Sequence, residues 1–196
     1  MSRRPWNHNI HYHPIVLRAI PSNCRRALDV GCGEGLLTRK LARHCEEVVG
    51  IDIDCHTLAR AAAFSSEGVT FVRGDAMTYP FGNASFDLIT AVATLHHLPL
   101  KAVLSRFRDL LRPGGVLAVV GLYRRHTLED FLWDAAAFPA SRAMRLLNVV
   151  PDVGAPLKDP HETLREIRAE CDALLPGAIF QRHLFFRYSF VWRKTA

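Results

Sequence analysis

The order of apolar and polar positions changes its period repeatedly along the first 122 residues. Short runs that are apolar throughout alternate with segments in which apolar residues return every three or four positions. The short runs indicate buried strands, and the longer segments indicate amphipathic helices. The predicted strands are ALDV (27–30), EVVGID (47–52), VTFVRG (69–74), FDLITAVATL (86–95) and VLAVVGLY (116–123). The predicted helices are LLTRKLARHC (36–45), CHTLARAAAF (55–64), capped by Asp54, and PLKAVLSRFRDLL (99–111). Because such strands need cover on both faces, the pattern predicts an α/β fold with a doubly wound, mostly parallel sheet.

The C-terminal part follows a different pattern. The segment HETLREIRAECDALL (161–175) predicts one more helix, and the β-rich runs AIFQRHLFF (178–186) and YSFVWRK (188–194) follow it. Since these two runs leave little room for a crossover helix, they must pair antiparallel, and we expect the sheet to end in a hairpin. Thr127 and Asp130 could cap a helix over 128–138. Near the start of the chain, a short helix is expected from Pro14 to Ile20.

Composition and charge narrow the class of protein. The chain has 196 residues, 49% of them hydrophobic, which suits one globular domain. No apolar stretch reaches the roughly 20 residues that cross a bilayer, so a cytoplasmic protein without a membrane segment is expected. The five cysteines include no CxxC pair, which favours reduced thiols over zinc. The formal charge of +6 raises the question of an anionic partner such as RNA, but the arginines are dispersed.

The segment DVGCGEG (29–35) places three glycines directly after the first predicted strand. Glycines there let the backbone approach a ligand while the next helix offers unpaired N–H groups. A dinucleotide site would carry GxGxxG, whereas Leu36 stands where the third glycine of that motif belongs. The spacing of Gly31, Gly33 and Gly35 behind the acidic Asp29 better suits a ligand with an amino-acid end than a pyrophosphate.

Two more carboxylates follow neighbouring strands. Asp52 closes the second strand, where a carboxylate can accept hydrogen bonds from both hydroxyls of a ribose. Asp75 closes the third strand and could accept a hydrogen bond from an exocyclic adenine amine. Ile53 and Met77 could cover the faces of the purine. Together with the glycine turn, these positions outline an adenosine with a charged tail.

At this point the chain resembles the class I S-adenosylmethionine-dependent methyltransferases, and within them the Methyltransf_11-like group. The resemblance covers residues 27 to about 122 and rests on five segments in order: LDVGCGEG, VVGIDID, GDAMTYPF, FDLITAVATLHHL and LLRPGGVLAVVG. It implies a Rossmann-like, seven-stranded sheet with a C-terminal antiparallel hairpin. It also implies S-adenosyl-L-methionine as cofactor and S-adenosyl-L-homocysteine as product, without a metal.

The resemblance assigns roles to particular positions. The cofactor-binding residues it implies, with those argued above, are Asp29, Gly31, Cys32, Gly33, Asp52, Ile53, Asp75, Ala76, Met77 and Ala91. Of these, Cys32 is interpreted as a small packing residue rather than a nucleophile. The single domain then divides into an N-terminal lid segment (1–22), a cofactor-binding core (23–122), a substrate-side insertion (123–158), and the last helix with the terminal hairpin (159–196).

Candidates for acceptor chemistry lie outside the glycine turn. His96 and His97 follow the fourth strand, and either imidazole could take a proton from an acceptor, although one could simply cap or pack there. Tyr12, His13 and Tyr123 are expected on the substrate side. His8, His11 and His13 do not suggest a metal site, because neither cysteine nor carboxylate stands among them.

The acceptor is expected to be a small molecule, methylated on oxygen, nitrogen or carbon. The chain lacks a [DN]PP[YF] motif after the fourth strand and a Pro-Cys nucleophile, and its insertion is too short for an extra domain. One alternative is an RNA methyltransferase resembling the wobble-uridine tRNA-modifying enzymes, supported by Arg182, Arg187, Arg193 and Lys194 in the terminal hairpin. Another is a non-catalytic, cofactor-binding partner subunit. Either a monomer or a homodimer is compatible with the sequence.

Overall fold

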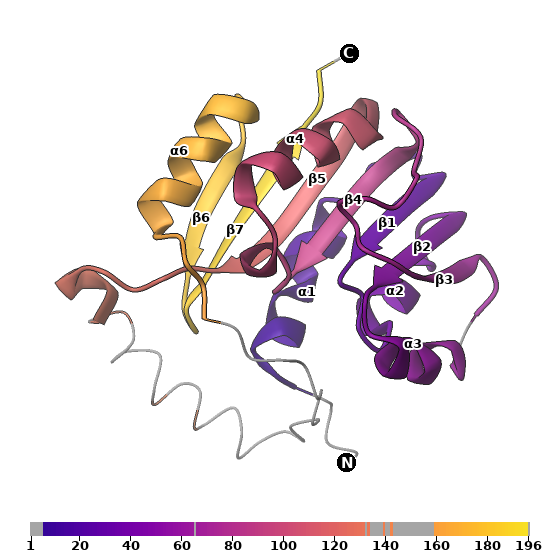
Figure 1. Ribbon diagram of the computed structural model, residues 1–196, viewed down its shortest axis with the longest axis horizontal. Helices are drawn as coiled ribbons and strands as arrows, with labels where there is room; N and C mark the ends of the chain where they lie inside the picture. Colours follow the sequence, from indigo (N-terminus) through magenta and orange to yellow (C-terminus); the bar gives the residue numbers. More distant parts are fainter. Residues whose placement is uncertain are drawn as a thin grey trace.

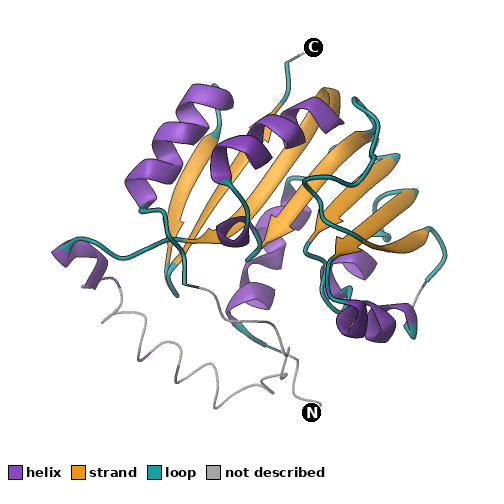
Figure 2. Cartoon of the chain, viewed as in Figure 1, coloured by secondary structure: helices purple, strands orange, loops and turns teal. Residues whose placement is uncertain are grey.

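The computed structural model describes residues 6–64, 66–131, 133, 139, 142 and 159–195. These residues form a seven-stranded sheet with helices packed on both faces (Figure 1; Figure 2). The strands are β1 (Arg26–Val30), β2 (Glu47–Asp52), β3 (Val69–Arg73), β4 (Phe86–Val92), β5 (Leu111–Leu122), β6 (Ile179–His183) and β7 (Arg187–Arg193). Their order across the sheet is β3-β2-β1-β4-β5-β7-β6. The predicted α/β class and the seven-stranded sheet are confirmed.

Strands β1 to β5 run parallel, and β7 lies antiparallel between β5 and β6. Phe190 of β7 stands opposite Val119 of β5 on one side and Phe180 of β6 on the other. The predicted terminal hairpin is therefore confirmed. The chain winds outward in opposite directions from β1 and β4, so the carboxyl ends of these two strands form the switch point of the sheet.

Helices cover the two faces of the sheet with separate apolar cores. The helices are α1 (His8–Arg18), α2 (Leu36–Leu41), α3 (Cys55–Ala62), the 3-10 turn η1 (Leu95–His97), α4 (Leu100–Leu110) and α6 (Leu164–Leu174). One core packs Leu104 of α4 and Ile167 of α6 against Phe190. The other packs Val16 of α1 and Leu41 of α2 against Val120. Within the described residues, no helix combines the length and apolar character needed to cross a membrane.

Two elements start earlier than the sequence pattern predicts. Helix α1 begins at His8 because the side chain of Asn7 accepts hydrogen bonds from the N–H groups of Asn9 and Ile10, and Pro14 is accommodated inside the helix. Strand β5 begins at Leu111, before the RPGG segment (112–115), because the pairing with β4 continues across a register shift at this segment. The RPGG segment, which predicted the end of a helix, therefore lies inside a strand where the register shifts.

The segment after β5 is only partly described. The Thr127 hydroxyl accepts a hydrogen bond from the Asp130 N–H, and the Asp130 carboxylate accepts hydrogen bonds from the N–H groups of His126 and Thr127. These contacts match the cap predicted at this point. Most of the helix expected over 128–138 lies outside the described residues.

Candidate functional site

The carboxyl ends of β1, β2, β3 and β4 lie along one edge of the sheet, and the candidate cofactor residues follow these strands (Figure 1). Open α/β sheets bind their ligands at this edge, beside the switch point. The three carboxylates expected there, Asp29, Asp52 and Asp75, have different surroundings. These surroundings show which carboxylates hold the fold together and which remain available to a ligand.

Asp29 is buried inside the fold, with 2% of its surface exposed. The hydroxyls of Thr38 and Thr90 donate hydrogen bonds to its two carboxylate oxygens, at 2.7 and 2.8 Å. Burial raises the pKa of Asp29 to about 6, although the two hydroxyls lower it. Asp29 thus joins β1 to α2 and to β4 from within. Its contact with the methionine part of a cofactor stays a prediction.

Gly31 fixes the first turn of the loop against β2 and β4. Its backbone has φ +67°, and its N–H donates a hydrogen bond to the Ile51 carbonyl at 2.8 Å. A β carbon here would collide with the Thr94 hydroxyl, which donates to the Val30 carbonyl at 3.0 Å. Only glycine meets both demands, the left-handed conformation and the close approach of Thr94.

Gly33 is less crowded than Gly31. Its φ is +53°, and the nearest atom to a β carbon built there would be a Thr57 methyl carbon 3.8 Å away, an ordinary van der Waals distance. The Gly33 N–H donates a hydrogen bond to the Asp52 carboxylate at 2.9 Å. The turn is therefore bonded to Asp52, and at Gly33 its backbone has no neighbour as close as Thr94 is to Gly31.

Cys32, between the two glycines, points into the protein. It is 8% exposed, and a β carbon on Gly50 would lie 3.0 Å from its sulfur. Burial, together with the nearby Asp29 and Asp52, raises the pKa of the thiol. A protonated, enclosed thiol is a poor nucleophile, in agreement with the packing role expected for it.

Asp52 and Ile53 occupy the end of β2. The second carboxylate oxygen of Asp52 accepts a hydrogen bond from the Asp54 N–H at 3.0 Å. Asp54 itself caps α3, since its side chain accepts from the N–H groups of His56 and Thr57, as predicted. Ile53 is 71% exposed, so a large apolar side chain stands uncovered next to the carboxylate. Such a surface suits the flat face of an aromatic ligand.

The turn after β3 carries Asp75, Ala76 and Met77. Asp75 is exposed, and its carboxylate accepts a hydrogen bond from the Met77 N–H at 2.8 Å. Arg106 of α4 donates to the Ala76 carbonyl at 2.7 Å and also to the Tyr79 carbonyl. Arg106 thus holds the turn through its backbone carbonyls, and the Asp75 carboxylate remains at the surface.

The end of β4 leads sharply into the histidine pair. Ala91 is fully buried, and Ala93 has φ +55°, a conformation that non-glycine residues adopt at some cost. The Ala93 N–H donates to the Val120 carbonyl at 2.8 Å, which holds the turn in place. His96 is buried and His97 is exposed, with their ring centroids 4.0 Å apart. The turn after β4 therefore places His97 at the surface.

Tyr12 and His13 lie inside α1. The Tyr12 hydroxyl donates to the Leu184 carbonyl at 2.7 Å, and burial raises its pKa to about 12. Leu184 lies in the turn between β6 and β7, and Arg187 after this turn pairs with Leu122 at the end of β5, so Tyr12 contacts the hairpin at the carboxyl edge of the sheet. The His13 Nδ1 lies 3.1 Å from the Lys40 ammonium, and burial, with help from Lys40, lowers the pKa of His13 to about 3. The substrate-side role of both residues stays a prediction.

Tyr123 follows β5 and is 3% exposed. Its hydroxyl accepts a hydrogen bond from Arg182 Nε at 3.1 Å. The same guanidinium forms ion pairs with Asp130 at 2.7 Å and Glu129 at 3.0 Å. Arg182 of β6 therefore fastens the segment after β5 to the terminal hairpin.

Sequence reasoning missed several residues that position the site. Thr38, Thr90 and Thr94 hold the glycine loop and β4 through their hydroxyls, and Arg106 and Arg182 hold the neighbouring segments. A threonine inside an otherwise apolar strand, as at Thr90, was the available signal for a buried polar partner. Nothing in the sequence singled out the two arginines among the other dispersed cations.

Comparison with known proteins agrees with this geometry. A family model described as a methyltransferase domain matches residues 28–119. An uncharacterized methyltransferase of Mycobacterium bovis is 38% identical over 193 residues, covering 97% of this chain and 98% of that protein. An O-methyltransferase of Penicillium expansum is 32% identical over 169 residues, covering 80% of this chain and 61% of that protein.

A solved structure shares the fold across nearly the whole chain. The crystal structure of a SAM-dependent methyltransferase from Methanosarcina mazei has a TM-score of 0.66 to this chain at 19% identity, covering 93% of this chain and 97% of that one. The relative that matches almost end to end, the matched family model and the shared fold lead to one assignment. The chain belongs to the Methyltransf_11 family of class I S-adenosylmethionine-dependent methyltransferases.

Proposed function

We propose that this methyltransferase binds S-adenosyl-L-methionine at the carboxyl ends of β1 to β4 and methylates an oxygen, nitrogen or carbon atom of a small molecule. The methyl donor leaves as S-adenosyl-L-homocysteine. The observation that carries the proposal is the turn at Gly31 to Gly33, which is bonded to Asp52 and is uncrowded at Gly33. The acidic and apolar side chains around this turn also fit the expected cofactor.

Asp52 and Asp75 supply hydrogen-bond acceptors at the proposed adenosine site. Each Asp52 oxygen accepts one backbone N–H, and a carboxylate oxygen can accept a second hydrogen bond, so both can also bind ribose hydroxyls. Asp75 is exposed and Ile53 stands uncovered between the two carboxylates in the chain. The negative charge along this edge also favours a ligand with a positive aminium and sulfonium.

The protein's contribution to the reaction is mainly positioning. When bound, S-adenosyl-L-methionine supplies a methyl group that is already activated for displacement. The turn after β4 then has to hold the acceptor in line with that group. We propose that His97, exposed on this turn, takes the proton from an acceptor hydroxyl or amine, and that buried His96 supports its ring. Tyr123, Tyr12 and His13 would act from the acceptor side.

The hairpin cations support a small acceptor over RNA. Arg182 is paired with Asp130 and Glu129, and Arg187 is 7% exposed and donates to the Asn9 side chain. Arg193 donates to the Gly114 carbonyl, and Lys194 Nζ donates to two carbonyls at the end of α4. Cations that already pair with groups of the protein are poor contributors to a phosphate-binding surface, which needs side chains that can reach outward.

Substitution of Gly33 by alanine tests the cofactor site, with Gly114 as a matched control. Both glycines have positive φ and no atom closer than 3.8 Å to an added methyl group, but Gly114 lies at the opposite edge of the sheet. Each substitution should cost roughly 1 kcal/mol of stability through backbone strain. Only Gly33→Ala should weaken S-adenosyl-L-methionine binding in calorimetry, by tenfold or more. Equal affinities in the two variants would refute the proposed site.

The acceptor is identified by incubating the protein with labelled methyl donor and a cell extract, followed by mass spectrometry of the product. A labelled metabolite, with turnover that changes little between low and high salt, supports a small-molecule acceptor. Labelled RNA, bound with an affinity that falls steeply with salt, would support the RNA alternative. Cofactor binding without any labelled product would favour the partner-subunit alternative.

A further inference from the structure

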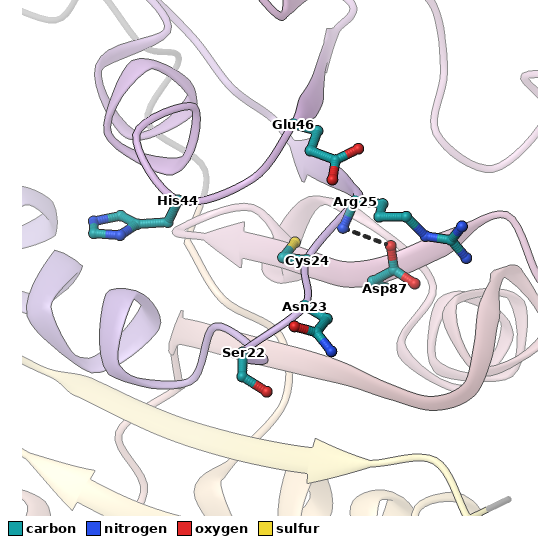
Figure 3. A pocket seen from close by; sticks show the side chains of 7 residues that line it. All are labelled: Ser22, Asn23, Cys24, Arg25, His44, Glu46 and Asp87. Carbon is teal, nitrogen blue, oxygen red and sulfur yellow. Dashed lines mark hydrogen bonds between the residues drawn. The ribbon is translucent and has the colours of Figure 1, made fainter.

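A hollow of about 550 Å³ opens at the amino ends of β1 and β4, at the edge of the sheet opposite the proposed cofactor site (Figure 3). It is lined by Ser22, Asn23, Cys24, Arg25, His44, Glu46 and Asp87. Asp87 is committed to the fold, since it accepts hydrogen bonds from the Arg25 N–H and from the Arg112 guanidinium. The oxidisable group of the lining is the thiol of Cys24, which small molecules can approach through the hollow.

Cys24 and Cys45 stand opposite each other because the pairing of β1 with β2 continues beyond the strand ends. Arg26 is the register partner of Glu47, and the Glu46 N–H donates a hydrogen bond to the Cys24 carbonyl at 3.2 Å. Counting back two positions from the Arg26 and Glu47 pair brings Cys24 level with Cys45. Neighbouring strands lie about 4.7–4.9 Å apart, which falls within the roughly 4.4–6.8 Å that separate the α carbons of a disulfide.

The two side chains meet in the same apolar core. Cys24 and Cys45 are 4% and 6% exposed and belong to the core between the sheet, α1 and α2. Their thiols share a hydrogen bond, which raises the pKa of Cys24 as the donor and lowers that of Cys45 as the acceptor. Both are free thiols in this structure. The lowered pKa favours the thiolate form of Cys45, which suits it to attack a mixed disulfide formed at Cys24.

We propose that Cys24 and Cys45 form a reversible disulfide when the protein meets a small disulfide oxidant such as oxidised glutathione. The Cys24 thiol, which lines the hollow, loses its proton and attacks one sulfur of the oxidant, which breaks the S–S bond and releases one glutathione thiolate. The Cys45 thiol then loses its proton and attacks the Cys24 sulfur of the mixed disulfide, and the second glutathione leaves. The protein loses two electrons and two protons, and one oxidised glutathione becomes two reduced molecules.

The bridge would close residues 24–45 into a loop that contains the whole DVGCGEG segment. Cross-linking residues this far apart restricts the unfolded chain, and it should raise the thermal midpoint by about 5 to 10 °C. It lies at the amino ends of β1 and β2, whereas the glycine loop and Asp52 lie at their carboxyl ends. The affinity for S-adenosyl-L-methionine should therefore change less than twofold.

The experiment oxidises the whole protein with glutathione and maps its disulfides. Trypsin leaves Cys45 and Cys55 on one peptide, so the map is made in the Cys55→Ala variant, which replaces an exposed thiol outside the proposed pair. We expect a mass loss of two hydrogens, a cross-linked peptide joining Cys24 to Cys45, and the higher thermal midpoint. Dithiothreitol should reverse all three. Cys24→Ala in the same background should abolish the cross-link and the rise in midpoint.

Three results would overturn the proposal. The first is that both cysteines stay reduced, and the second is a stable glutathione adduct on either cysteine without the internal bridge. The third is a bridge from Cys24 or Cys45 to Cys32 or Cys171. Because the map of the Cys55→Ala protein is decisive by itself, the conclusion does not depend on whether Cys24→Ala folds well.

Discussion

The cofactor half of the molecule and its acceptor half hold their polar groups in different ways. In the cofactor half, which is the part proposed to bind S-adenosyl-L-methionine and comprises β1 to β4 with their turns, backbone N–H groups donate to carboxylates: Gly33 donates to Asp52, and Met77 donates to Asp75. In the acceptor half, α1 with the segment after β5 and the β6–β7 hairpin, cations join distant parts of the chain. Arg187 binds Asn9, 178 positions away. The two halves are therefore held by different kinds of polar contact.

The largest effect is expected at His97, after β4, where a substitution should lower turnover without weakening cofactor binding. If His97 acts as the general base, His97→Ala should lower turnover at saturating cofactor about a hundredfold or more, while the dissociation constant of the cofactor stays within about twofold. His44→Ala, an exposed histidine at the opposite edge, serves as the control. Steady-state kinetics and calorimetry measure the two quantities. A loss of turnover below threefold would rule out a base at this position.

At Asp52 we expect a substitution to act first on cofactor binding. Asp52→Ala removes the proposed acceptor for two ribose hydroxyls and should weaken S-adenosyl-L-methionine binding by roughly 2 to 4 kcal/mol, since each hydrogen bond to a charged group contributes about 1.5 to 3. The matched control is Asp54→Ala, which removes the cap of α3 and should cost about 1 kcal/mol of stability with little change in affinity. Calorimetry that finds both variants equal to the parent would remove Asp52 from the site.

The same division explains what the sequence could predict. Strands, the hairpin and the turn at Gly31 to Gly33 follow from short-range periodicity and glycine spacing, and the structure confirms these elements. The full burial of Asp29 could not be predicted, because it depends on Thr90, which comes from another strand 61 positions away. The docking of Tyr12 against Leu184 spans 172 positions and leaves no local signal. Long-range contacts of this kind occur in both halves, and the local sequence does not reveal them.

An intermediate effect, on the free energy of unfolding, is expected for substitution of Arg182 in the acceptor half. Burial raises the pKa of Asp130, but the His126 and Thr127 N–H groups and Arg182 outweigh it, so this pKa is lowered overall. Arg182→Met would leave a carboxylate that is 9% exposed without its cation, and the free energy of unfolding should fall by about 2 kcal/mol.

Urea unfolding measures this loss against Arg193→Met, whose guanidinium donates at the surface and which should cost no more than about 0.5 kcal/mol. Arg182→Met should also raise the KM of the acceptor while leaving cofactor affinity unchanged. A rise in the cofactor dissociation constant instead would show that the two halves are coupled rather than independent.

The smallest expected effect tests whether α1 is a fixed part of the fold in acid. Burial, with a smaller contribution from Lys40, lowers the pKa of His13 from 6.5 to about 3 in the folded protein. The unfolded chain therefore binds this proton more tightly, and the stability present above pH 6.5 is lost as the pH falls toward 3. At pH 5.5 the loss relative to pH 7.5 should be about 1.4 kcal/mol from His13 alone.

His13→Gln should shrink the pH dependence by that amount, as measured by urea unfolding at both values. His11 and His183, whose pKa values burial also lowers, remain in both proteins, so the difference isolates His13. An undiminished pH dependence in His13→Gln would mean that α1 lets this imidazole reach water and bind its proton, as a lid over the acceptor site would.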